Sequence, residues 1–217
     1  MNLKTVCERT AFFVSVYKRK KACDTIKKRH RKEMTAMLFE QKTRMMKDGR
    51  ECVLASPDPN DAKSMLDYLK TCAEETDNIL RYPEECDESN EQEETFLRNI
   101  NESQYNVMIV CKVDGDIAGN CTLTLNKRLK IKHRASVAIA LKRKYWNLGI
   151  GTMMFEEMEK IAREKNVLQL ELGFVGGNDR ARILYEKRGF VKTGKKPDAF
   201  YLKDGSFRDE ILMIKKL

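Results

Sequence analysis

The segment Leu141-Lys-Arg-Lys-Tyr-Trp-Asn-Leu-Gly-Ile-Gly-Thr152 joins an apolar run to a stretch whose apolar residues have helical spacing. We expect it to form the turn from a strand into a helix. Glycines at 149 and 151 permit backbone dihedrals and close approaches that other residues do not. The free N–H groups at a helix start, with the positive end of its dipole, bind anions. The turn therefore predicts a pyrophosphate site, beside the positive charges of Lys142, Arg143 and Lys144.

The same glycines also fit two other structures, a simple tight turn and the phosphate loop of a dinucleotide-binding fold. Glu171 follows Gly151 by 20 residues, which suits the ribose-binding carboxylate of that fold. However, Met154 occupies the position of the third glycine of the fingerprint, and preceding antiparallel strands suit the fold poorly. We therefore disfavour the dinucleotide interpretation.

The apolar pattern on either side of the turn predicts a domain of mixed strands and helices. Apolar runs predict strands at 51–55, 107–113, 117–125, 135–141, 168–174, 190–193 and 211–214. Helical spacing predicts helices from 61 to 73, 90 to 100, 150 to 162 and 180 to 187. The order β-α-α-β-β-β-α-β-α-β-β indicates an α/β or α+β domain.

A second segment, Asn178-Asp-Arg-Ala-Arg-Ile-Leu-Tyr-Glu-Lys-Arg-Gly-Phe190, places Asn178 and Tyr185 two helical turns apart on one face. Each has an ordinary structural interpretation, Asn178 as a helix N-cap and Tyr185 as a core aromatic. In combination with the strand 137–141 and the turn 145–152, however, this segment closely resembles the GCN5-related N-acetyltransferase (GNAT) family. The ending Asp209-Glu-Ile-Leu-Met213 is typical of bacterial, single-domain members.

The resemblance implies a GNAT-like fold with a central mixed, mostly antiparallel sheet, flanked by helices and splayed between the strands at 135–141 and 168–174. It also implies acetyl-coenzyme A as co-substrate, with no metal. The backbone of Ile139, Ala140 and Leu141 is then expected to pair with the pantetheine arm, and Asn178 to contact the cofactor. The residues expected at the pyrophosphate are Asn147, Leu148, Gly149, Ile150, Gly151 and Thr152.

The implied activity is transfer of an acetyl group to a primary amine by direct attack in a ternary complex. By resemblance, Tyr185 lies near the thioester sulfur as the catalytic acid, and a backbone N–H near Leu141 polarises the carbonyl. Two alternatives stay open. One is acetylation of protein N-termini or lysines, and the other is a non-catalytic coenzyme A sensor on the same fold.

Two departures from the family pattern concern the site. Trp146 stands where relatives often carry Arg or Gln, so that Arg143 or Lys144 is expected to replace one phosphate contact. The strand positions where relatives keep a general-base Glu hold Ala or Ser at 135–138, and Gly173. Glu171, His133 and an ordered water are all candidates for the base, which we leave unassigned.

The charge of the chain is unevenly distributed. The formal net charge of +9 comes from 42 Lys and Arg against 33 Asp and Glu. Residues 1–44 alone carry +9, residues 45–105 carry −10 and residues 106–217 carry +10. The acidic region predicts attraction of a cationic acceptor, such as a polyamine, an aminoglycoside or a lysine-rich peptide. A merely solvated acidic face explains it equally well.

Residues 1–44 have no counterpart in the family pattern and predict a basic extension peripheral to a GNAT domain at 45–217. We favour a loosely attached extension, or upstream sequence ahead of a natural start at Met45, over an arm that binds nucleic acid or a membrane surface. Seven scattered cysteines without a C-x-x-C pair argue against a disulfide framework and a zinc site. We expect a cytoplasmic protein, and leave open whether it is a homodimer.

Overall fold

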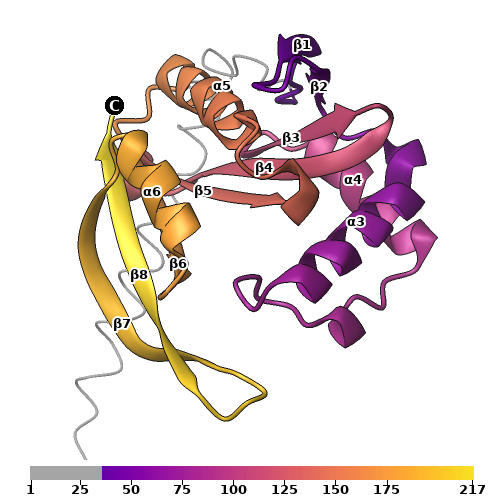
Figure 1. The fold of residues 1–217 in the computed structure, drawn as a ribbon. Helices are drawn as coiled ribbons and strands as arrows, with labels where there is room; N and C mark the ends of the chain where they lie inside the picture. The colour runs from indigo at the N-terminus through magenta and orange to yellow at the C-terminus, as the bar shows by residue number, and fades with distance from the viewer. Residues whose placement is uncertain (1–35) are drawn as a thin grey trace, which may run out of the picture. The chain divides into compact units, whose positions relative to one another are not determined.

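The structure, a computed structural model, describes residues 36–217, and Ala36–Leu217 form one compact unit. Strands dominate this unit, with helices inserted between them (Figure 1). The strands are β1 (Lys42–Met45), β2 (Glu51–Ala55), β3 (Asn106–Val113), β4 (Asp116–Leu125), β5 (Arg134–Leu141), β6 (Gln169–Val175), β7 (Val191–Tyr201) and β8 (Phe207–Lys216). The α-helices are α3 (Ala62–Glu75), α4 (Asn90–Asn101), α5 (Ile150–Glu164) and α6 (Asp179–Lys187), and a short 3₁₀ helix, η2, spans Pro83–Glu85.

All eight described strands form one sheet in the order β1-β2-β3-β4-β5-β6-β8-β7. Every neighbouring pair is antiparallel except β5 and β6, which run parallel. The predicted fold class, a mixed and mostly antiparallel sheet flanked by helices, is therefore confirmed.

The helices divide between the two faces of the sheet. Successive residues of a strand point to opposite faces, and β3 shows the division. Ile109 and Cys111 belong to the larger buried cluster, which includes Met154 and Phe155 of α5. Met108 and Val110 belong to a second cluster with α3 and α4, which includes Tyr68, Met65 and Leu97. The helices α5 and α6 thus cover one face, and α3 and α4 cover the other at the β2–β4 end.

The strands β5 and β6 pair over three residues only and then diverge. Their parallel register runs from Arg134 opposite Gln169 to Ser136 opposite Glu171. Beyond that point β5 continues along β4 as far as Leu141, and β6 continues along β8 as far as Val175. The predicted splay between these two strands is confirmed. We call the opening that it leaves the β5–β6 gap.

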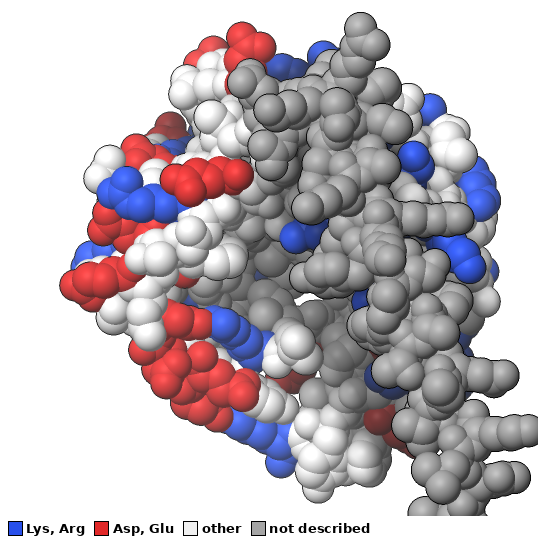
Figure 2. Space-filling view, turned by 180° about the vertical axis from the view of Figure 1, so that it is seen from behind, with Lys and Arg blue, Asp and Glu red and all other residues white. Residues whose placement is uncertain are grey.

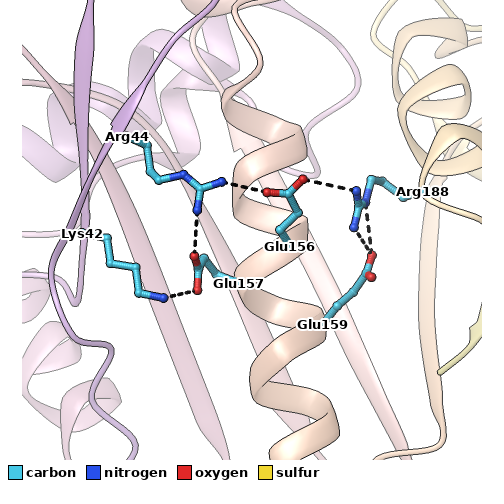
Figure 3. A network of polar contacts seen from close by, with 6 residues as sticks. All are labelled: Lys42, Arg44, Glu156, Glu157, Glu159 and Arg188. Carbon is cyan, nitrogen blue, oxygen red and sulfur yellow. Dashed lines mark hydrogen bonds and ion pairs between the residues drawn. The ribbon is translucent and has the colours of Figure 1, made fainter.

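The strand β1 was not predicted from the sequence. It pairs antiparallel with β2, and its cations reach across to α5 (Figure 3). The Nζ atom of Lys42 lies 2.5 Å from Oε2 of Glu157, and Nη1 of Arg44 lies 3.3 Å from Oε1 of the same carboxylate. Arg44 also pairs with Glu156 at 2.9 Å. Glu157 is only 5% exposed, so these cations neutralise a buried charge.

The compact unit therefore begins before the boundary that the sequence predicts at residue 45. Met37 and Phe39 are buried in the larger cluster, and the N–H of Phe39 donates to Oγ of Ser56 at 2.8 Å. Residues 36–44 thus pack against the sheet, because their apolar side chains and cations have partners there. The rest of the predicted extension, residues 1–35, lies outside the described residues.

A chain shortened to begin at Met45 is expected to be much less stable than one that begins at Ala36. The shorter chain loses Met37, Phe39 and both cations that pair with Glu157, and a buried charge left without its partner costs about 3–5 kcal/mol. Urea denaturation of the two chains measures the difference. Adding Glu157→Gln to the shorter chain should recover part of the loss. Equal urea midpoints would show instead that residues 36–44 contribute nothing.

Candidate active site

The turn into α5 has the geometry of an anion site. Asn147 and Gly149 have φ of +66° and +91°, in the left-handed region that favours glycine and asparagine. Gly149 is the N-cap of α5, and neither a capping side chain nor an acidic residue occupies the first turn. The N–H groups of Ile150, Gly151 and Thr152 are therefore available, at the positive end of the helix dipole, to an anionic group.

Gly151 allows α5 to start close to β5 and α6. A Cβ atom on Gly151 would lie 3.0 Å from Cδ2 of Leu184 on α6, and 3.7 Å from side-chain atoms of both Ile139 and Leu141 on β5. A side chain at this position would thus displace the end of the Leu184 side chain. Predicted site residues from the turn, β5 and α6 meet here, beside the β5–β6 gap.

The end of β5 directs backbone groups into the β5–β6 gap. The N–H of Lys142 donates to the carbonyl of Ala118 on β4 at 3.0 Å. Because N–H groups alternate between the two edges of a strand, those of Ile139 and Leu141 point to the opposite edge. Beyond Ser136 that edge has no pairing with β6. Ala140, in contrast, faces β4, and its carbonyl accepts from the Tyr68 hydroxyl at 3.0 Å.

Trp146 fixes the turn and sits among cations. Its indole Nε1 donates to the carbonyl of Leu141 at 2.8 Å. The guanidinium carbons of Arg143 and Arg180 lie 5.6 Å and 4.5 Å from its ring centroid. Arg180 also donates to Oδ1 of Asn147 at 2.7 Å. We did not single out Arg180 from the sequence, since its place beside the turn depends on how α6 packs.

Asp116 holds the residues that follow β5. Lys142 and Lys144 pair with its carboxylate at 2.8 Å and 2.9 Å, and the Tyr145 hydroxyl donates to it at 2.9 Å. Burial alone would raise the pKa of Asp116, but these three hydrogen bonds outweigh it and lower the pKa to about 2. The two lysine ammonium groups are thus engaged by Asp116. The other cations beside the turn are Arg143, Arg180 and Lys47, whose side chain lies against Gly149.

Tyr185 is buried against three aromatic rings. Its ring centroid lies 5.6 Å from that of Phe155, 5.5 Å from that of Phe174 and 6.1 Å from that of Phe190. Burial raises its pKa to about 12. The core interpretation of this residue therefore holds for its ring. A catalytic role for its hydroxyl stays a prediction.

Asn178 caps α6, as its ordinary interpretation predicts. Its Oδ1 accepts from the N–H of Ala181 at 3.1 Å. Capping engages the side-chain oxygen only, so the amide nitrogen stays available as a donor. The expected contact with the cofactor stays a prediction.

The two candidate side-chain bases have different surroundings. Glu171 lies in the last β5–β6 pair and forms a two-pronged ion pair with Arg134, whose Nη2 lies 2.6 Å from Oε2. The hydrogen bond from Arg134 lowers the pKa of Glu171, which makes this carboxylate a weaker base. His133 is exposed at the start of β5, and its carbonyl accepts from the N–H groups of Leu168 and Gln169. Both residues lie at the closed end of the gap.

A cavity of about 420 Å³ lies at the open end of the β5–β6 gap. It is lined by the end of α3 and the residues that follow it, by Arg143 after β5, by the end of β6 with the two glycines after it, and by the hairpin of β7 and β8. Among these residues are Glu75, Asp77, Arg143, Val175, Gly176 and Arg208. The cavity therefore offers charges of both signs next to the gap.

A family model for acetyltransferases of the GNAT family matches residues 63–190, more than half of the chain. The matched residues include β5, the turn, the β5–β6 gap and α6 with Asn178 and Tyr185. The chain therefore belongs to the GNAT family, as the sequence motifs predict.

Individual relatives agree with this assignment. The chain is 30% identical over 108 residues to the L-amino acid N-acetyltransferase AaaT of Escherichia coli. The aligned residues cover 48% of this chain and 65% of that protein. The chain spans about half to two thirds of the length of the curated relatives it matches. A GNAT acetyltransferase structure from Streptococcus pneumoniae has a TM-score of 0.71 at 28% identity, over 76% of this chain and 99% of that one. The fold is shared with a Salmonella typhimurium acetyltransferase, YncA, solved with acetyl-CoA, at a TM-score of 0.65 and 14% identity over 76% and 94% of the chains.

Asp116→Asn is expected to lower stability in a pH-dependent way. Because the folded-state pKa of Asp116 lies below its ordinary value of 3.8, its stabilising effect is present above that value and is lost as pH falls toward about 2. The melting temperature of the unaltered chain should therefore exceed that of the variant at about pH 6, by a margin that shrinks toward about pH 2.

The control is Asp67→Asn, which removes an exposed pair with Lys63 and should change the melting temperature little. A margin for Asp116→Asn that does not vary with pH would contradict the role given to this carboxylate.

Proposed function

We propose that this chain transfers an acetyl group from acetyl-coenzyme A to a primary amine by direct attack in a ternary complex. The observation that carries the proposal is the β5–β6 gap, with the open helix start of α5 at its end and Tyr185 beside it. Membership of the GNAT family supports it. The coenzyme then takes the place of the missing strand neighbour of β5.

The proposed cofactor contacts follow the chemistry of the available groups. The N–H groups of residues 150–152 suit the pyrophosphate. Arg180 beside Asn147 adds a positive charge there, whereas Lys142 and Lys144 are paired with Asp116. The N–H groups of Ile139 and Leu141 suit the carbonyl oxygens of the pantetheine arm. The N–H of Leu141 is our candidate for the group that polarises the thioester carbonyl.

Tyr185 is our candidate for the catalytic acid. With a pKa of about 12, its hydroxyl stays protonated at any pH at which the reaction can be measured. It is therefore always ready to donate a proton to the departing thiolate, whose conjugate thiol has a pKa near ~8.5. The raised pKa also makes the phenol a weaker acid, and the transfer to a free thiolate is uphill by the difference in pKa, so the site must assist it.

Tyr185→Phe is expected to lower kcat about 10²-fold or more, while coenzyme A affinity and melting temperature change little. Phenylalanine retains the ring packing against Phe155, Phe174 and Phe190 and removes only the hydroxyl. The measurement is thiol release from acetyl-coenzyme A across a panel of amines. Tyr105→Phe, directly before β3 and away from the open end of the gap, serves as the matched control.

The results separate the proposed enzyme from its alternatives. An unchanged kcat in Tyr185→Phe would remove this residue from the mechanism. Tight binding of acetyl-coenzyme A by the unaltered chain, with no turnover for any amine, would favour the coenzyme A sensor. Turnover restricted to peptides would favour a protein acetyltransferase.

We further propose that the acceptor carries positive charge. Figure 2 shows Asp and Glu side chains gathered over the part of the molecule that holds α3, η2 and α4. The acidic residues of this region include Glu74, Glu75, Asp77, Glu84, Glu85, Asp87 and Glu88. Glu75 and Asp77 also line the cavity at the end of the gap. The acidic surface thus continues to the point where an amine would enter.

Neutralising this surface with Glu74→Gln and Asp77→Asn is expected to lower kcat/KM for a polyamine several-fold at low ionic strength. Both side chains are exposed, so the fold should tolerate the change. The effect should fade at about 1 M salt, where the screening length is ~3 Å. Glu51→Gln on β2 is the matched control. Equal rates for neutral and cationic amines at every salt concentration would refute electrostatic attraction. The amines tested should include an L-amino acid, because the E. coli relative is named for that class of substrate.

A further inference from the structure

The side chain of Glu210 places a carboxylate over Gly173 of β6, the strand that borders the gap. Glu210 lies on β8, opposite Val175 in the register with β6, and its side chain turns toward Gly173. A Cβ atom on Gly173 would lie 3.1 Å from Cδ and 3.3 Å from Cγ of Glu210, and closer still to Oε1. The carboxylate of Glu210 therefore fills the space that a side chain at position 173 would take.

Glu210 and Tyr185 approach β6 from opposite faces. Phe174 points to the face covered by α5 and α6, where its ring contacts that of Tyr185. Because neighbouring residues of a strand point to opposite faces, Gly173 opens on the other face, where Glu210 lies. A thioester in the gap beside residues 173–174 would have the phenol on one side and the carboxylate on the other.

The carboxylate also lies next to the route by which an amine would enter. Val175, its partner in the register, lines the cavity at the open end of the gap. Arg208 lines the same cavity and precedes Glu210 by two residues on β8, hence on the same face. Glu210 therefore lies on the same face of β6 as Val175, which lines the cavity, and Tyr185 lies on the opposite face.

Glu210 is half-buried and, within residues 36–217, forms no ion pair, whereas Glu171 is held by Arg134 and Asp116 by two lysines. The charged side chains around it come from several elements. Lys196 faces it across the register of β7 and β8. The others are Glu171 on β6, Arg208 on β8 and, around the cavity, Glu75, Asp77 and Arg143.

From this arrangement we propose that Glu210 is the base that accepts the proton of the acceptor ammonium. The inference rests on the proposed N-acetyltransferase function and assigns the one group that the sequence leaves open. The acceptor class is a primary amine that is protonated in solution, because only such an amine needs a base before it can attack.

The proton and electron balance of the step is complete. The ammonium gives one proton to Glu210, which frees the nitrogen lone pair, and this pair forms the N–C bond while the C–S bond breaks. The sulfur keeps the electron pair of that bond and takes the proton of the Tyr185 hydroxyl. The second nitrogen proton returns to the tyrosinate through solvent, and Glu210 releases its proton to water. One proton is released for each acetyl group transferred.

Glu210→Gln tests the proposal with acetyl-coenzyme A and a series of amines of different pKa. For an amine that is protonated at about pH 7, we expect kcat/KM to fall by about 10²-fold or more. The loss should shrink as pH rises toward the pKa of the amine, and should be small for a weakly basic amine that is already neutral. Glu164→Gln, at the exposed end of α5, is the matched control.

Gly173→Ala provides a second variant that leaves the carboxylate in the chain but displaces it. The three atoms nearest to the added methyl group all belong to the flexible Glu210 side chain, so the protein should fold with a near-normal melting temperature. We expect the same dependence on amine pKa as in Glu210→Gln, with a smaller loss.

The outcomes distinguish this inference from the function on which it rests. A loss in Glu210→Gln that is equal for protonated and neutral amines, or no loss at all, overturns the base assignment while the enzyme stays an acetyltransferase. Absence of turnover by the unaltered chain with every amine overturns the proposed function itself. A loss confined to protonated amines, shared by Gly173→Ala, supports the assignment.

Discussion

The short pairing between β5 and β6 is the constraint on which the site depends. After three residues β5 and β6 no longer pair with each other, while β5 stays paired with β4 and β6 stays paired with β8. Backbone N–H and C=O groups need hydrogen-bond partners when water is excluded. An edge inside a sheet is therefore a place for a ligand that offers its own amides, in the manner of an added strand. In the proposed function, the coenzyme binds where the sheet is incomplete.

The two faces of the sheet supply different chemistry to this opening. The face under α5 and α6 is apolar, so it holds Tyr185 in a fixed position and keeps its hydroxyl protonated. On the other face α3 and α4 cover only the β2–β4 end, which leaves β6 and β8 accessible to an acceptor. Because side chains alternate along β6, Phe174 lies next to the proposed acid, Tyr185, and the neighbouring residue Gly173 lies next to Glu210 on the other face.

The sequence predicts those parts of the structure that depend on local patterns. Apolar periodicity gave each helix and seven of the eight strands, and the glycines of the turn marked the start of α5. The strand β1 was missed because Lys42-Thr-Arg-Met45 has little apolar character, and it is held by Glu157 from a distant helix. The pairing of Asp116 with the lysines after β5, and the position of Glu210 over Gly173, depend on strand register. No local pattern encodes them.

The charged side chains show most clearly why strand register determines which groups are available for proton transfer. Counted along the chain, Lys142, Lys144 and Glu171 look like participants in catalysis or binding, yet each is paired with an opposite charge in the fold. Pairing raises the pKa of Lys144 and lowers that of Glu171, so that each resists a change of protonation. Proton transfer is better suited to a carboxylate without such a partner that stands at the opening. Glu210 meets that description because a glycine on the neighbouring strand gives its side chain room to turn inward.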